Sequence, residues 1–211
     1  MTLTWQVRRL LRLAPVLFAC VALSAWAQSV DRLKAILGDP AARTAAADAG
    51  RKISSFCANC HGVDGNSKLS EVPNLAGQNP IYLLNQVHKF YTGERRDQWM
   101  EPVIKLLSET ERLNIVTYYI GQSVMPASSA APNAEGREIY HRVCFRCHGD
   151  QARGGERFPR LAGQQNIYLI RSLTRYRDRA GTRMEPEMLA MTAALKDSDI
   201  KAVADYLSSM H

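Results

Sequence analysis

One pentapeptide occurs twice in the chain, as Cys-Ala-Asn-Cys-His at residues 57–61 and as Cys-Phe-Arg-Cys-His at residues 144–148. This order of residue types is the attachment signature of c-type haem. Each of the two thiols forms a thioether to a vinyl group on one porphyrin edge, and the next histidine places an imidazole nitrogen under the iron. The repeat therefore predicts two covalently bound haems. The predicted attachment residues are Cys57, Cys60, Cys144 and Cys147, and the predicted proximal iron ligands are His61 and His148.

Paired cysteines have other uses, which fit this spacing less well. A four-thiolate zinc site usually has its pairs about 15–20 residues apart, whereas Cys60 and Cys144 are 84 residues apart and each pair has its own histidine. A thioredoxin-like dithiol belongs near a βαβ pattern, and the sequence shows no convincing strand. Coincidence explains one such pentapeptide more easily than two in register.

The N-terminus has the pattern of a secretory signal peptide over residues 1–27. Arginines precede an apolar run at residues 13–23, and residues 25–27 read Ala-Trp-Ala, which predicts cleavage before Gln28. The apolar run is short for a membrane span, so an uncleaved anchor is the weaker alternative. Export agrees with haem attachment, which takes place outside the bacterial cytoplasm. Cys20 leaves with the signal peptide, so every cysteine of the mature chain lies in the two motifs.

The mature chain is mildly basic. Removal of residues 1–27 changes the formal net charge from +7 to +4, because that segment carries three arginines and no acids. Such a charge suits docking on an acidic protein or peripheral association with a membrane, although an ordinary solvated surface explains it equally well. The chain has no basic-aromatic stripe and no nucleic-acid motif, so we expect no binding to nucleic acid.

The two halves stay in register beyond the motifs. Residues 73–78, Pro-Asn-Leu-Ala-Gly-Gln, match residues 159–164, Pro-Arg-Leu-Ala-Gly-Gln, and an Ile-Tyr-Leu follows each block. Apolar residues at helical spacing then predict helices over 80–92 and 166–179. A Ser108 to Glu111 capping box predicts the start of the helix that closes the first half, and Asp197 or Ser198 is expected to cap its counterpart.

These patterns predict an all-α chain that is a tandem repeat of two small helical domains. The first domain, here the first repeat, is expected at residues 43–122, and the second domain, the second repeat, at residues 134–211. A linker of small residues and prolines is expected at residues 123–133. Residues 28–42 form a leader with a short helix at 29–37, which ends at Gly38 and has no counterpart in the second half. Each repeat is small for a core of its own, and the haem would supply the missing apolar volume.

Methionines are the candidates for the sixth iron ligand. A thioether closes the iron and favours its ferrous state. Met100 is the one methionine between His61 and the first closing helix, whereas the second repeat offers Met184, Met188 and Met191. The Met-Glu-Pro tripeptide at Met100 recurs at Met184. Met100 and Met188, however, both lie 11 residues before the matching acid of the closing helix, and Met184 lies 15 before it. We therefore favour Met188 and keep Met184 as the alternative.

The two motifs, the two Pro-x-Leu-Ala-Gly-Gln blocks with their Tyr-Leu, and the methionine spacing resemble the dihaem cytochrome c4 family. The resemblance covers nearly all of the mature chain. It implies two class I cytochrome c domains, each wrapped around one haem with His and Met ligands, and again points to Met188. It further implies that Pro73 and Pro159 offer their carbonyls to the proximal imidazoles, which would strengthen ligand donation.

The resemblance implies a periplasmic carrier of single electrons between redox proteins, from a membrane-bound donor toward a terminal oxidase. A cytochrome subunit of a dehydrogenase or flavoprotein is the alternative. A dihaem peroxidase-type enzyme fits less well, because such enzymes need an open iron or an unusual ligand, and each half here offers a methionine. We therefore expect an electron carrier without a reaction of its own.

Overall fold

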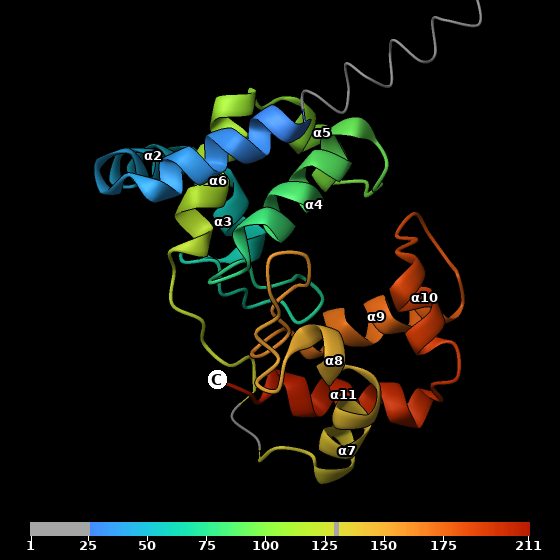
Figure 1. Ribbon diagram of the computed structural model, residues 1–211. Coiled ribbons are helices and arrows are strands. Elements are labelled where there is room, and N and C mark those ends of the chain that lie inside the picture. The colour runs from blue at the N-terminus through green and yellow to red at the C-terminus, as the bar shows by residue number, and fades with distance from the viewer. Residues whose placement is uncertain (1–25, 129–130) are drawn as a thin grey trace, which may run out of the picture. The chain divides into compact units, whose positions relative to one another are not determined.

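The computed structural model describes residues 26–128 and 131–211 (Figure 1). The predicted signal peptide lies almost wholly outside the described residues, so its cleavage before Gln28 stays a prediction. The chain divides into two compact units, Met1–Arg43 and Thr44–His211. In the first unit residues 26–38 are helical, which confirms and extends the helix expected at 29–37. Within the described part of the chain no helix combines the length and apolar character needed to cross a bilayer.

The two sequence repeats form matching series of helices, and the described residues contain no strand. The expected all-α fold is therefore confirmed. The first series is α2 (Pro40–Ile53), α3 (Ser55–His61), α4 (Pro80–Thr92), α5 (Met100–Lys105) and α6 (Glu109–Ile120). The second series is α7 (Ala134–Val143), α8 (Phe145–His148), α9 (Asn166–Arg177), α10 (Pro186–Thr192) and α11 (Asp197–Ser208).

The closing helices, α6 and α11, begin in two different ways. At α6 the expected capping box is present: Ser108 N donates to the Glu111 carboxylate at 2.8 Å and Glu111 N donates to Ser108 Oγ at 3.3 Å. The expected cap of α11 at Asp197 or Ser198 is wrong, because Lys196 is the N-cap residue. The Asp199 carboxylate reaches back to accept from Lys196 N at 2.9 Å, so it fixes the helix start one residue earlier.

A glycine brings the first helix of each repeat against its closing helix. A Cβ added at Gly50 of α2 would lie 2.1 Å from the Asn114 carbonyl oxygen of α6. A Cβ added at Gly136 of α7 would lie 2.0 Å from the Ala202 carbonyl oxygen of α11. Backbone atoms cannot yield to such overlap, so both crossings need a residue without a side chain. The Cys-x-x-Cys-His motifs lie directly after α2 and α7, so these two equivalent crossings position them.

Tyrosines on the closing helices fill the cores, namely Tyr118, Tyr119 and Tyr206. Tyr119 is fully buried, and the other two are 7% exposed. The Tyr118 hydroxyl donates to the Val63 carbonyl at 2.7 Å, just past the first motif. The closing helix of the first repeat is therefore tied directly to the loop that follows the first haem motif.

The predicted linker at residues 123–133 contains no helix or strand where it is described. It is nevertheless packed against both repeats. A Cβ at Gly77 would lie 2.5 Å from one methyl group of Val124, and a Cβ at Gly163 would lie 3.0 Å from the other. Val124 thus sits between the two Leu-Ala-Gly-Gln turns, and the linker forms part of the contact between the repeats.

Candidate haem centres

The first centre is carried by α3, which holds the whole first motif. Cys57 is half-buried and Cys60 is exposed, while His61, the last residue of the helix, is 6% exposed. His61 Nδ1 lies 2.9 Å from the Pro73 carbonyl oxygen. Because a carbonyl only accepts, Nδ1 carries the proton and Nε2 keeps its lone pair for a metal. The contact expected for Pro73 is therefore present.

The second centre repeats this arrangement on α8. Cys144 is the N-cap residue, Cys147 lies within the helix and is exposed, and His148 ends the helix at 5% exposure. His148 Nδ1 lies 3.1 Å from the Pro159 carbonyl oxygen, so the same tautomer is fixed here. Each repeat therefore presents two thiols and one oriented imidazole from a single short stretch of chain.

The electrostatics of these groups fit haem better than the alternatives. Burial lowers the pKa of His61 and of His148 against the opposing bonds to the proline carbonyls, so both rings are neutral, as ligation requires. Burial raises the pKa of the Cys57 thiol, and raises that of Cys144 to about 12. A redox dithiol needs a low-pKa thiolate instead. The described residues also contain no group of three or more side chains placed to bind zinc.

The methionines lie on short helices that precede the closing helices. Met100 is the first residue of α5 and is half-buried, and its backbone N–H donates to the Asp97 carboxylate at 3.0 Å. Met188 lies within α10 and is also half-buried. Met184 precedes α10 and Met191 lies within it, and both side chains are 49% exposed. Met100 and Met188 thus share a half-buried place on the short helix before the closing helix, and their ligation of iron stays a proposal.

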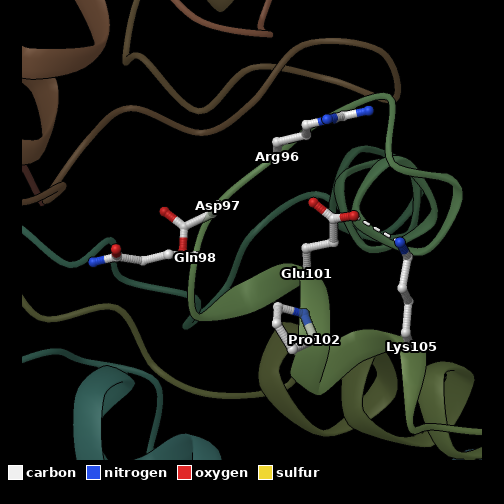
Figure 2. Close-up of a pocket in the computed structure, with 6 residues that line it drawn as sticks. All are labelled: Arg96, Asp97, Gln98, Glu101, Pro102 and Lys105. Atoms are coloured by element: carbon white, nitrogen blue, oxygen red, sulfur yellow. Dashed lines mark hydrogen bonds and ion pairs between the residues drawn. The ribbon is translucent and has the colours of Figure 1, made fainter.

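Figure 2 shows an open hollow next to α5, lined by Arg96, Asp97, Gln98, Glu101, Pro102 and Lys105. Glu101 and Lys105 form an ion pair across one side of it at 2.6 Å. None of the predicted haem ligands lines this hollow, and its charged walls do not suit an apolar macrocycle. We therefore do not count it as part of either haem centre.

A pair of buried glutamines joins the repeats, a feature that sequence reasoning missed. Gln164 Oε1 accepts from Asn74 N at 2.7 Å, and Gln164 Nε2 donates to the Asn74 carbonyl at 3.1 Å. Gln78 Oε1 accepts from Arg160 N at 2.7 Å, and Gln78 Nε2 donates to the Arg160 carbonyl at 3.0 Å. We call these four residues the glutamine clamp. The doubled Pro-x-Leu-Ala-Gly-Gln block was its only signal in the sequence.

Arg183 makes a second link between the repeats. Its guanidinium donates to the Tyr82 hydroxyl at 3.1 Å and to the Tyr168 hydroxyl at 3.2 Å. These tyrosines are the equivalent residues of the two Ile-Tyr-Leu segments. Burial alone would raise the pKa of Tyr168, but the charges of Arg183 and Arg95 lower it to about 8. Two matched hydroxyls therefore share one cation at the contact between repeats.

An all-α repeat with a buried imidazole, oriented by a proline carbonyl and preceded by two cysteines, defines a c-type cytochrome, and this chain contains that unit twice. A model of the family "Cytochrome c" matches residues 47–118 and 133–211. The chain is 33% identical to cytochrome c4 of Pseudomonas aeruginosa over an alignment of 181 residues, and the alignment covers 78% of this chain and 89% of that protein. The chain belongs to the dihaem cytochrome c4 family, as its motifs predicted.

Solved and curated relatives agree with this assignment. The structure of reduced cytochrome c4 from Pseudomonas stutzeri superposes with a TM-score of 0.72 at 28% identity, covering 78% of this chain and 98% of that one. The thiosulfate dehydrogenase electron acceptor of Thiomonas intermedia is 33% identical over 172 residues, covering 72% of this chain and 77% of that protein. The chain is thus an electron-transfer protein with two covalently attached c-type haems.

Proposed function

We propose that this protein is exported to the periplasm and carries single electrons between respiratory partners, from a membrane-bound donor toward a terminal oxidase. The observation that carries the proposal is the repeated pair of ligand positions. Each repeat has an imidazole oriented by a proline carbonyl and a methionine on the short helix before the closing helix. The signal-peptide pattern of residues 1–27 supports export.

Two axial ligands per iron suit a carrier. In the proposed sites His61 and Met100 would hold one haem iron, and His148 and Met188 would hold the other. A haem held in this way would supply one-electron chemistry, and the thioether ligand would raise its potential by favouring the ferrous ion. The haems would supply the redox chemistry, while the chain orients the two imidazoles that would hold them.

A redox titration with absorption spectra tests the ligation that the carrier role requires. We expect two one-electron steps and, in the oxidised protein, a weak far-red band from methionine-to-ferric charge transfer. Added hydrogen peroxide should not be turned over at an appreciable rate. A high-spin ferric spectrum together with peroxidase turnover would contradict the proposal and would favour the dihaem peroxidase alternative.

Service to a dehydrogenase is the second candidate, and the similarity to the Thiomonas intermedia electron acceptor favours it specifically. Rapid-mixing kinetics distinguish the two directions. Reduced protein mixed with membranes that contain a terminal oxidase should be reoxidised in a cyanide-sensitive reaction. Oxidised protein mixed with thiosulfate and a thiosulfate dehydrogenase should stay oxidised. Rapid reduction in the second mixture without oxidation in the first would assign the protein to the dehydrogenase instead.

A further inference from the structure

One peptide group links the first proximal histidine to the second repeat. The Pro73 carbonyl accepts from His61 Nδ1 at 2.9 Å. The N–H of the same peptide group belongs to Asn74 and donates to Gln164 Oε1 at 2.7 Å. The imidazole of one repeat and the side-chain amide of the other therefore bind opposite ends of a single dipole.

The reverse connection has the same form. The Pro159 carbonyl accepts from His148 Nδ1 at 3.1 Å, and the N–H of that peptide group, from Arg160, donates to Gln78 Oε1 at 2.7 Å. Each glutamine thus binds the peptide group that accepts from the proximal histidine of the other repeat.

The glutamine amides are held in one orientation. Gln164 Oε1 also accepts from Gln165 N at 2.9 Å, and Gln78 Oε1 also accepts from Asn79 N at 2.9 Å. Reversal of either amide would face its NH₂ group with two N–H donors, so the oxygen must point at the peptide group. Gln78 and Gln164 are 7% and 6% exposed, which keeps water from replacing these bonds.

Hydrogen bonds in a chain polarise one another, by about 10–30% per bond in condensed-phase estimates. A peptide whose N–H is bound has a more negative carbonyl oxygen, which draws more strongly on the imidazole N–H. The imidazole then becomes a stronger donor and stabilises ferric iron. We propose that Gln78 and Gln164 are positioning residues that tune the potential of the haem in the opposite repeat. This inference rests on the proposed ligation by His61 and His148.

Replacement of each glutamine by methionine, which has similar size but only a weakly accepting thioether, provides a test in both directions. In Gln164→Met the potential of the haem at His61 should rise, and that of the haem at His148 should change much less. In Gln78→Met the pattern should reverse. The potentials are followed haem by haem from assigned hyperfine-shifted NMR signals during a redox titration. The Nδ1 proton signal of the affected histidine should shift in the same crossed manner.

Asn79→Ala is the matched control. Asn79 Nδ2 makes hydrogen bonds to the Arg153 and Phe158 carbonyls of the second repeat at 3.0 and 2.7 Å, but contacts neither peptide group of the clamp. Its loss should weaken the contact between repeats without crossed shifts. If Gln164→Met does not fold with both haems, Gln164→Asn serves instead, because its shorter side chain withdraws the acceptor but stays polar.

The crossed pattern in the potentials and in the imidazole protons would support the inference. Shifts confined to the mutated repeat, equal shifts of both haems, the same pattern in Asn79→Ala, or no shift would overturn it. Failure of the proposed function has a separate signature. A wild-type spectrum without the charge-transfer band would reject the methionine ligation, while the crossed imidazole shifts would still report on the clamp.

Discussion

Replacement of Met188 by alanine should open the second haem, whereas replacement of Met184 should not. Met188 lies half-buried within α10 and, like Met100, is 11 residues before the acid of the closing helix. Met184 lies before α10 with 49% of its surface exposed. The Met188→Ala iron should become high-spin and its potential should fall, because the ferrous state loses a soft ligand.

The size of each effect follows from the two-repeat architecture. The proposed thioether ligands are equal in number to the haems, so Met188→Ala should remove about half of the far-red band and Met184→Ala none. Replacement of a fully buried methionine by alanine lowers the free energy of unfolding by about 2–5 kcal/mol. Replacement of the half-buried Met188 should lower it by roughly half of that, apart from the lost iron bond. The exposed Met184 should cost within about 0.5 kcal/mol, as for other surface substitutions.

Both variants should first be shown by intact mass to carry two haems, and then compared with wild type by far-red absorption, ferric electron paramagnetic resonance and redox titration. Loss of half the band in Met184→Ala, with Met188→Ala unchanged, would refute the spacing argument and move the ligand to the Met-Glu-Pro copy. An intact band in both variants would mean that the second iron has a different ligand.

Three further results are expected. Gly50→Ala should lower the thermal midpoint of the holoprotein, because the new Cβ overlaps a carbonyl of α6 and such overpacking typically costs about 1–3 kcal/mol; Gly155→Ala, with no atom within 4 Å of its Cβ, is the control, and equal midpoints would contradict the crossing geometry. Burial opposes the ionisation of Glu185, but its hydrogen bond from Tyr176 and the nearby positive charges hold its pKa below the ordinary value. The ionised carboxylate therefore stabilises the fold above the ordinary pKa, and this stabilisation is lost as the pH falls through the lowered pKa. The acid dependence of the thermal midpoint should weaken in Glu185→Gln, and an unchanged profile would exclude this contribution. N-terminal sequencing of the periplasmic protein should begin at Gln28, and a retained Met1 in the membrane fraction would support an anchor instead.

Local sequence signals predicted the helices well where one residue type determines the boundary. Pro80 starts α4 and Gly93 follows its end, so the expected range of 80–92 matches the observed helix. The start of α11 was misplaced because Asp199 can cap the preceding backbone N–H from inside the helix, and such a reach-back competes with a cap at Asp197. Choices of this kind depend on side-chain conformation, which the sequence leaves open.

The haem motifs were evident because covalent attachment requires residues that are close in sequence. The glutamine clamp was not evident, since Asn74 and Gln164 are 90 residues apart and meet only after the repeats dock. The register of the two Leu-Ala-Gly-Gln blocks indicated a duplicated element, but a repeat carries no information about which face meets its copy. No sequence pattern indicated the role of Arg183, because this single residue binds two equivalent tyrosines and is not part of a repeated motif.

The glutamine clamp is self-complementary. Each repeat supplies one glutamine side chain and the backbone N–H and C=O of one residue, and receives the same groups from the other repeat. Contacts of this kind are isologous, so they have the symmetry that two identical chains need to form a closed dimer. A single-haem chain carrying one Pro-x-Leu-Ala-Gly-Gln block would already contain both the glutamine and the backbone groups that this contact needs. Fusion of two such chains would convert a concentration-dependent dimer into a permanent pair that keeps the same interface, and the equivalent positions could then differ, as Asn74 and Arg160 do.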